Sequence, residues 1–367
     1  MKFRIEEWTI QELIACHIAD NLDLSPPYQR RFIWSLEDQR ILIESISKNY
    51  PFPNIFLKEV SPGKFEVVDG QQRTRTIISF RNGDFEDFNN SKFSEADYPE
   101  FDNFKISVII IEEITDTDIS IEGFYGLVNS AGVHLNRPEI KKAEYYDTQF
   151  LKLINACNDY QNFKDLGLFT DTVLKRMNDM DFVSEIIVLL KDGITDKKET
   201  IDKTFEEDIT TAQHEELYNM FTSIVDDIFE LNELFLIRKT RYKQKNDFYT
   251  LFGFLKDNPV PSDYRKYIYK ILVLIAIDIT PSNEDCIPFQ NYARNCVTQS
   301  NSKTARLERK LFLENLFLNQ NPEPNPAQRE ILNFYEMSQI ELVEHDIFFT
   351  IDLDYLMSQK PSILFNA

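Results

Sequence analysis

The spacing of hydrophobic and polar residues changes several times within the first 150 residues. Residues 3–5 alternate as a strand does, and residues 8–18 repeat with the spacing of an amphipathic helix. Residues 55–59 and 65–68 alternate on either side of a Ser-Pro-Gly-Lys turn, which predicts a β-hairpin. Residues 71–80 and 118–128 have helical spacing, and the Ile/Val-rich residues 105–111 indicate a buried strand. This mixture predicts a small α+β domain.

Two helix starts in this region carry capping signals. Ser35 precedes an apolar helical pattern and is followed three residues later by Asp38, an approximate capping box. Asn136 is followed by Pro138 in the first turn and by Glu139 at the third position. We expect the helix after Ser35 to end before Pro51, because the residue before a proline avoids the helical conformation.

From about residue 150 onward, the strand signals fade and helical spacing dominates. Helical patterns cover residues 174–190, 205–236, 248–255, 264–277 and 307–318. Residues 191–208 are polar and predict a loop or a solvated face, and the Asn/Pro-rich residues 319–326 predict a linker into a last helix. The chain is therefore predicted to have two domains, an α+β domain over residues 1–150 and a mainly α-helical domain over residues 151–367.

The charge balance restricts how this chain could contact nucleic acid. Its 367 residues include 40 Lys and Arg against 61 Asp and Glu, a net charge of −21. Proteins that coat nucleic acid are basic, because their affinity comes from releasing counterions from phosphates. Any DNA contact must then use a local patch, and the candidates are Arg30-Arg31 and the basic residues within 238–245 and 303–310. For the two distal clusters, a solvated helix face is the favoured interpretation.

Several classes of site are absent from the sequence. The four cysteines have no Cys-x-x-Cys spacing, and no two of the four histidines lie four residues apart. There is no Walker P-loop, no Gly-x-Ser-x-Gly and no His-Asn-His nuclease pattern. Acidic residues occupy the start of the chain where a signal peptide is apolar, and the apolar runs are too short to span a bilayer. We therefore expect a cytoplasmic protein with no membrane partner.

The sharpest motif is Asp69-Gly-Gln-Gln-Arg73-Thr-Arg75, at a predicted change from strand to helix. Free N–H groups and the helix dipole make such a helix start an anion site, and Gly70 permits close approach of a ligand. Arg73 and Arg75 could bind phosphate oxygens, and Asp69 could hold a divalent cation or a ribose hydroxyl. The alternative is a polar structural turn whose arginines pair with nearby acids. The residues alone leave both interpretations open.

Two further segments could take part in the same chemistry. Tyr28-Gln-Arg30-Arg31 places consecutive cations beside aromatic residues, which suits a phosphate or a stacked base. For Phe32 and Trp34, packing into the core is the favoured interpretation. Residues 129–132, Asn-Ser-Ala-Gly, form another predicted turn with exposed N–H groups.

Taken together, these segments resemble one family. Pro27-Tyr-Gln-Arg30 with Trp34, the Asp-Gly-Gln-Gln-Arg73 turn, and Asn129-x-x-Gly-x-x-Leu-x-x-x-Glu139 resemble domain-of-unknown-function family 262. This is the ParB/sulfiredoxin-like N-terminal domain of GmrSD-type modification-dependent restriction enzymes. The resemblance covers about residues 10–150. It extends loosely into the helical part through Arg176-x-x-Asp179 and Lys245-Asn-Asp247.

The resemblance implies a ParB/sulfiredoxin-like domain that binds and hydrolyses a nucleoside triphosphate with Mg²⁺ or another divalent cation, in bacterial defence against phage. Matched position by position, the implied nucleotide-binding residues are Tyr28, Gln29, Arg30, Gly70, Gln71, Gln72, Arg73, Arg75 and Asn129. Asp69 and Arg73 are the expected catalytic residues, with Arg30 also stabilising charge on the transferred phosphoryl group. Asp69 and Asn129 are the expected metal ligands.

The sequence departs from these enzymes in lacking a His-Asn-His nuclease region. Either a partner nuclease subunit or an effector that acts differently is therefore expected, and DNA cleavage by this chain alone is not. The alternatives are a binding module that senses a nucleotide or a modified base without turnover, and a DNA nickase that uses the same motif. The sequence leaves open which nucleotide binds and whether the chain forms a homo-oligomer.

Overall fold

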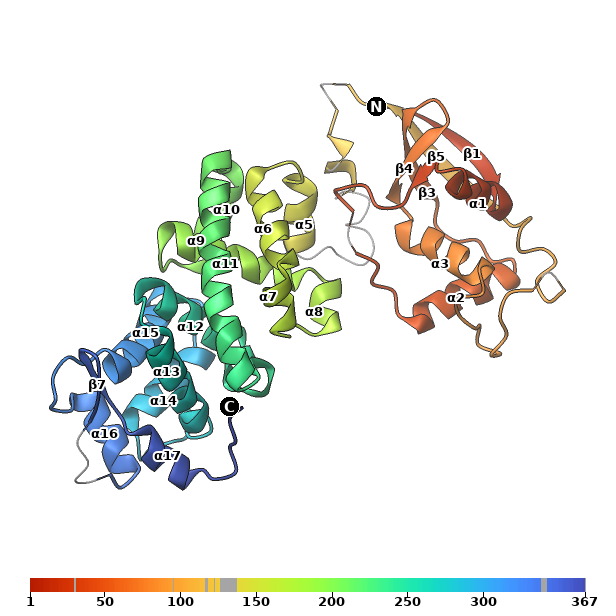
Figure 1. The fold of residues 1–367 in the computed structure, drawn as a ribbon. Coiled ribbons are helices and arrows are strands. Elements are labelled where there is room, and N and C mark those ends of the chain that lie inside the picture. The colour runs from red at the N-terminus through yellow and green to blue at the C-terminus, as the bar shows by residue number, and fades with distance from the viewer. Residues whose placement is uncertain are drawn as a thin grey trace. The chain divides into compact units, whose positions relative to one another are not determined.

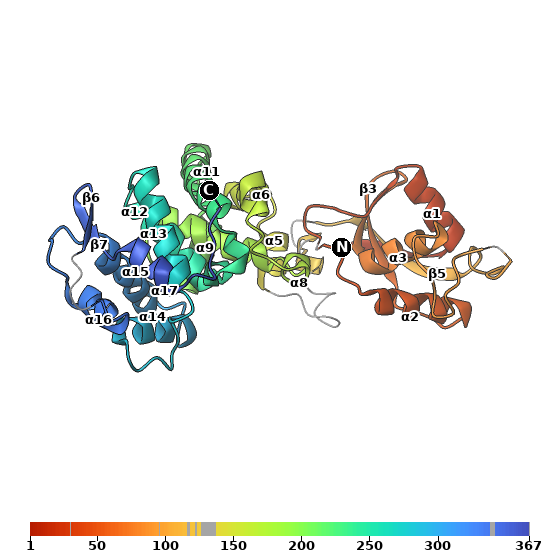
Figure 2. The same cartoon turned by 60° about the horizontal axis from the view of Figure 1, so that its bottom comes forward.

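The structure is a computed structural model that describes residues 1–29, 31–94, 96–115, 118–121, 123–125, 137–337 and 342–366 (Figures 1 and 2). The chain divides into two compact units. Unit 1 consists of residues 1–146 and 171–178, and unit 2 of residues 147–170 and 179–367. Each unit is described by itself below.

Unit 1 is built on a mixed five-stranded sheet with the strand order β1-β5-β3-β4-β2. Strands β3 and β4 are antiparallel neighbours and confirm the predicted hairpin. β5 lies antiparallel to β1 and parallel to β3, and the short β2 lies parallel to β4. The strands are β1 (Lys2–Thr9), β2 (Leu22–Asp23), β3 (Ile55–Ser61), β4 (Lys64–Asp69) and β5 (Lys105–Glu113).

Three helices of unit 1 bury their apolar residues in a core on one face of this sheet. They are α1 (Ile10–Ile18), α2 (Leu36–Ser47) and α3 (Gln71–Arg81). Ile43 of α2 and Ile77 of α3 are fully buried there with the inward strand residues Leu57 and Val108. α2 begins with the capping box of Ser35 and Asp38, as predicted. Along the chain, β4 ends at Asp69 and α3 begins at Gln71, so the strand leads directly into the helix.

A second, smaller apolar cluster lies on the other side of β4 and β5. It joins Val68 and Ile111 to Tyr28, Tyr125 and Ala143. Ala143 belongs to α5 (Arg137–Glu144), and the short α8 (Asp171–Lys175) is also part of unit 1. Of the predicted helix 118–128, residues 121 and 123–125 are helical, whereas residues 126–128 lie outside the described part, as does the predicted cap Asn136.

Unit 2 is mainly helical and carries one small hairpin, which the sequence pattern did not predict. The hairpin consists of β6 (Val343–His345) and β7 (Phe348–Thr350). The helices are α6 (Gln149–Asp159), α7 (Gln161–Asp165), α9 (Asn178–Asp192), α10 (Lys197–Glu207), α11 (Thr211–Leu234), α12 (Lys245–Asp257), α13 (Ser262–Ile275), α14 (Ile287–Val297), α15 (Lys303–Phe317), α16 (Pro326–Phe334) and α17 (Leu353–Gln359). Among the described residues, none of the helices has the length and apolar character that crossing a bilayer requires. The predicted fold class, an α+β domain followed by a mainly helical one, is confirmed.

Two predictions within unit 2 are wrong in detail. For residues 191–208, predicted as a loop or a solvated face, the loop is wrong, because α10 occupies most of them and buries Ile201 and Phe205. The predicted helix over residues 205–236 is interrupted at Asp208, whose backbone has a φ of 58°. The Asp208 carboxylate accepts hydrogen bonds from the backbone N–H groups of Gln149 and Phe150 at the start of α6. The break is also marked locally, because Thr210 and Gln213 form a capping box at the start of α11.

Candidate functional site

The predicted anion site lies where β4 ends and α3 begins. Gly70 is the N-cap of α3 with a φ of 100°, and no side chain caps this helix. A Cβ atom at Gly70 would also lie 3.0 Å from Cγ1 of Ile55, so both backbone angle and space require glycine here. The first turn of α3 thus keeps the N–H groups and the positive dipole end that suit an anion.

Asp69 and Arg73 form an ion pair across this turn. Nη2 of Arg73 lies 2.6 Å from Oδ2 of Asp69 and donates a second hydrogen bond to the carbonyl of Asn54. Nε of Arg73 is buried without a hydrogen-bond partner in the described structure. The pair is the arrangement expected of a structural turn, and it leaves part of the guanidinium's donor capacity unused.

The two glutamines of the motif bind the chain itself. Oε1 of Gln72 accepts hydrogen bonds from the N–H groups of Ile33 and Trp34, at 2.8 and 3.2 Å. Nε2 of Gln72 donates to the carbonyl of Arg31 and to Oε1 of Gln71. Nε2 of Gln71 in turn donates to the carbonyl of Leu24, and both glutamines are buried. They therefore hold residues 24–34 against α3, which makes them positioning residues.

Gln29 connects the first motif to the same turn. Its Nε2 donates hydrogen bonds to the carbonyls of Val67 and Val68, at 2.8 and 2.7 Å, at the end of β4. Its own carbonyl accepts a hydrogen bond from Nζ of Lys142, at 2.9 Å. Gln29 of the first motif is thus hydrogen-bonded to the two residues that precede the Asp-Gly-Gln-Gln-Arg segment.

Lys142, on α5, is a cation of this site that the sequence reasoning missed. Burial and the nearby charge of Arg31 lower the pKa of its ammonium group. Within the described residues it forms no ion pair, and its one hydrogen bond is to the uncharged carbonyl of Gln29. An anion bound near Lys142 would stabilise its charged form, which burial and the charge of Arg31 disfavour. The signal that could have found it is its position three residues after Glu139, on the same helix.

The aromatic residues of the first motif pack inside unit 1. Tyr28 is buried with its ring centroid 5.8 Å from that of Tyr125, and its hydroxyl donates to Glu66 at 3.4 Å. Trp34 is partly buried against the core, as predicted. Nη1 of Arg31 donates to the carbonyl of Leu174 at 2.7 Å. Arg30 and Asn129, both predicted site residues, lie outside the described residues.

Comparison with known families matches the part of the chain that carries these motifs. Residues 10–146 match the family model of the GmrSD restriction endonuclease, N-terminal domain. The match confirms the resemblance and relates this part of the chain to restriction systems. Neither a curated protein nor a solved structure matches the chain.

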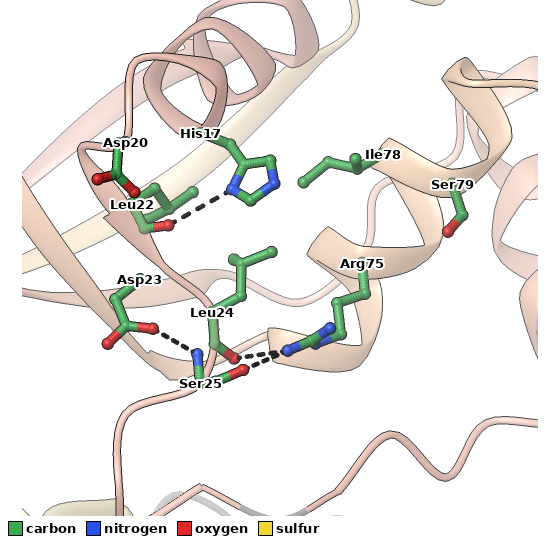
Figure 3. Close-up of a pocket in the computed structure, with 9 residues that line it drawn as sticks. All are labelled: His17, Asp20, Leu22, Asp23, Leu24, Ser25, Arg75, Ile78 and Ser79. Carbon is green, nitrogen blue, oxygen red and sulfur yellow. Dashed lines mark hydrogen bonds between the residues drawn. The ribbon is translucent and has the colours of Figure 1, made fainter.

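Arg73 and Arg75 of the GmrSD-type domain do not point to a common anion. Two positions along a helix correspond to a rotation of about 200°. Whereas Arg73 contacts Asp69 and Asn54, Nη2 of Arg75 hydrogen bonds to Oγ of Ser25 and to the carbonyl of Leu24 (Figure 3). The idea that both arginines grip one phosphate therefore finds no support in this geometry.

The donor set at the turn fits a divalent cation only when the nucleotide brings it. Among the described residues, no three His, Cys, Asp or Glu side chains form a group that could hold a metal ion. Asp69 is the predicted ligand within the described part of the motif, and Mg²⁺ is commonly held by one or two carboxylates together with substrate phosphates and water. An ion bound by Asp69 would have to compete with Arg73 for the carboxylate.

The two segments that loosely match the family, at residues 176–179 and 245–247, each contribute a side chain to an ion pair inside the fold. Nη2 of Arg176 lies 3.2 Å from Oε2 of the buried Glu139, so two segments of the resemblance meet within unit 1. In unit 2, the buried Asp247 pairs with Nε of Arg241 at 2.9 Å.

The two distal basic clusters are solvated only in part. Arg238 and Lys239 are exposed, whereas the other arginines of the clusters are largely buried. Arg241 is largely buried and paired, as above. Arg306 is 3% exposed and pairs with the equally buried Glu185 at 2.5 Å. Arg309 is fully buried and donates to the carbonyls of Asn295 and Ser300. Arg241, Arg306 and Arg309 cannot reach phosphates, because their guanidinium groups form hydrogen bonds and ion pairs inside unit 2.

Proposed function

We propose that the GmrSD-type domain binds a nucleoside triphosphate at the start of α3 and hydrolyses it as part of a restriction system that acts against phage DNA. The observation that carries this proposal is Lys142, an ammonium group without an ion pair among the described residues, hydrogen-bonded to Gln29 beside the uncapped helix start. A triphosphate supplies the negative charge that this arrangement lacks.

The proposed roles follow from what each group can donate or accept. Lys142 and the N–H groups of the first turn would bind phosphate oxygens, and Arg73 would stabilise charge that develops on the transferred phosphoryl group. Asp69 would orient the attacking water or the divalent cation. Mg²⁺, when bound with the nucleotide, neutralises phosphate charge. Arg30 and Asn129 keep the roles that the resemblance implies. Gln29, Gln71 and Gln72 would position these groups without touching the nucleotide.

A second candidate function is favoured by the Asp69–Arg73 ion pair. A carboxylate held by an arginine at 2.6 Å is poorly placed to bind a cation or to activate water. On this alternative the domain senses a nucleotide or a modified base without turnover and signals to a partner. In either case a separate nuclease subunit would cut the DNA, because the chain has no His-Asn-His pattern.

The two candidates differ in phosphate release. ATP, GTP, CTP and UTP would be tested with Mg²⁺ by calorimetry and by an assay for released phosphate, using the wild type, Asp69→Asn, Arg73→Gln and Lys142→Ala. Lys64→Ala is the charge-matched control, because Lys64 is exposed on the β3–β4 turn. Hydrolysis that Asp69→Asn abolishes while binding persists supports the enzyme. Binding without phosphate release supports the sensor, and unchanged binding in Lys142→Ala contradicts both.

A further inference from the structure

A second pocket of unit 1 lies on the side of α3 away from Arg73, and the proposed triphosphate site does not use it. It has a volume of about 370 Å³ and is formed by the end of α1, by β2 with the residues that follow it, and by α3 (Figure 3). Leu22, Leu24 and Ile78 form its apolar wall. The volume is within the range of small-ligand sites.

Arg75 supplies the positive charge of this pocket. Only its Nη2 makes hydrogen bonds, to the hydroxyl of Ser25 and the carbonyl of Leu24. Nε is buried without a partner, and Arg75 takes part in no ion pair within the described residues, although the chain has 61 acidic residues. An arginine in this condition retains donors and an uncompensated charge, which together suit a phosphate group.

Two carboxylates line the same pocket. Asp23 accepts a hydrogen bond from the N–H of Ser25 through Oδ1 only. The carboxylate of Asp20 is exposed and forms no hydrogen bond or ion pair in the described part of the chain. Both carboxylates line the space into which Arg75 projects (Figure 3). They disfavour a polyanion such as a triphosphate, whereas they can accept hydrogen bonds from vicinal hydroxyls.

We propose that this pocket is a second ligand site, which binds a nucleoside monophosphate. Arg75 binds its single phosphate, Asp20 and Asp23 accept hydrogen bonds from the ribose hydroxyls, and the apolar wall contacts the base. The site shares none of its groups with the Asp69–Arg73 pair. It is therefore a separate binding surface, although the carbonyl of Leu24 in its wall also accepts a hydrogen bond from Gln71 of the motif.

The test measures binding of AMP, CMP, GMP and UMP to the full chain by calorimetry. We expect at least one of them to bind, Arg75→Gln to weaken that binding at least tenfold, and the matched Arg73→Gln to leave it unchanged. A 2′,3′-dideoxy monophosphate should bind more weakly than its ribose parent, and inorganic phosphate more weakly still. Failure of all four to bind at millimolar concentration overturns the proposal, and so does a loss in Arg73→Gln but not in Arg75→Gln.

Asp20→Asn gives a second readout that does not depend on how Arg75→Gln folds. Asn tolerates the left-handed backbone of this position, φ 57°, and the side chain is exposed. We expect this variant to lose the preference for the ribose form over the dideoxy form. Equal preference in wild type and variant contradicts the assignment of the hydroxyls. If free amino acids bound as tightly as the monophosphates, the natural ligand would be a zwitterion, and the assignment of a nucleoside monophosphate would be wrong.

Discussion

Lys142 donates a hydrogen bond of 2.9 Å to the backbone carbonyl of Gln29. The side chain of Gln29 in turn donates hydrogen bonds to the carbonyls of Val67 and Val68, at the end of β4. The contact joins α5 to the strand that leads into the Asp-Gly-Gln-Gln-Arg turn. A cation whose pKa is lowered therefore contacts the residue that is hydrogen-bonded to the end of β4.

Nucleotide affinity should depend on the charge of Lys142. Its pKa is lowered, so the ammonium loses its proton at a lower pH than an ordinary lysine, near 10.4. Triphosphate affinity should therefore fall as pH rises from neutral through that lowered pKa. Lys142→Arg should keep its affinity over the same range, because arginine stays charged. Calorimetry between pH 7 and 10 measures both, and equal pH dependence would remove Lys142 from the site.

The lowered pKa of Lys142 also makes the free energy of unfolding depend on pH. The unfolded chain holds the Lys142 proton more tightly than the folded chain, so this residue's contribution to stability rises with pH between its lowered pKa and the ordinary one. Lys142→Met should remove that rise. The unfolding free energy of both proteins in this pH window decides the point.

Gln72→Ala should destabilise unit 1 by about 1–3 kcal/mol, because it leaves the partly buried N–H groups of Ile33 and Trp34 without an acceptor. Trp8 and Trp34 are the chain's two tryptophans and both belong to unit 1, so tryptophan fluorescence in urea reports on this unit. Gln39→Ala is the control, since its amide makes only long bonds of 3.3 and 3.5 Å. Equal effects of the two substitutions would contradict the positioning role.

Gly70→Ala should cost more stability than Gly63→Ala. Both glycines have a positive φ, but a Cβ at Gly70 meets Ile55 at 3.0 Å, whereas nothing lies within 4 Å of a Cβ at Gly63. Backbone strain alone costs about 1–3 kcal/mol at such positions, and Gly70→Ala adds the steric contact. Urea unfolding followed by tryptophan fluorescence measures both variants. Similar losses of stability in the two variants would show that Ile55 of β3 moves away from the added methyl group at no measurable cost.

Arg306→Ala should destabilise unit 2 by about 3–5 kcal/mol, because it leaves the buried Glu185 carboxylate unpaired. The control is Arg329→Ala, which removes a side chain that is 62% exposed and lies 3.7 Å from Glu323, and which should change stability little. Unfolding followed by circular dichroism detects the helical unit. A near-neutral Arg306→Ala would restore this cluster as a candidate surface patch.

Weak and strongly salt-sensitive DNA binding is expected of the isolated chain, because its net charge is −21 and Arg241, Arg306 and Arg309 of the distal clusters are largely buried. We also expect no cleavage of unmodified duplex with Mg²⁺. Fluorescence anisotropy over a salt series and a nicking assay measure these. Tight binding near 200 mM salt would contradict the charge argument. Nicking that Asp69→Ala abolishes would make this domain the nuclease.

Local signals in the sequence predicted much of the GmrSD-type domain. Ser35 with Asp38 placed the start of α2, and the turn between residues 59 and 65 placed the hairpin, because capping and turn chemistry act within a few residues. The motif turn itself was predicted at the start of α3, where Gly70 lies. Such features need no knowledge of distant residues.

Tertiary structure decided which charges are available to a ligand. The sequence shows Arg73 and Arg75 as neighbours, but helical rotation directs them to different partners, and folding buries Arg306 against a carboxylate 121 positions away. Lys142 joins the site only because α5 packs beside the end of β4. Whether a charged side chain is paired, buried or open depends on contacts between distant segments. The sequence by itself therefore determined the local elements and the motif, whereas the packing of those elements decided which cations remain to bind an anion.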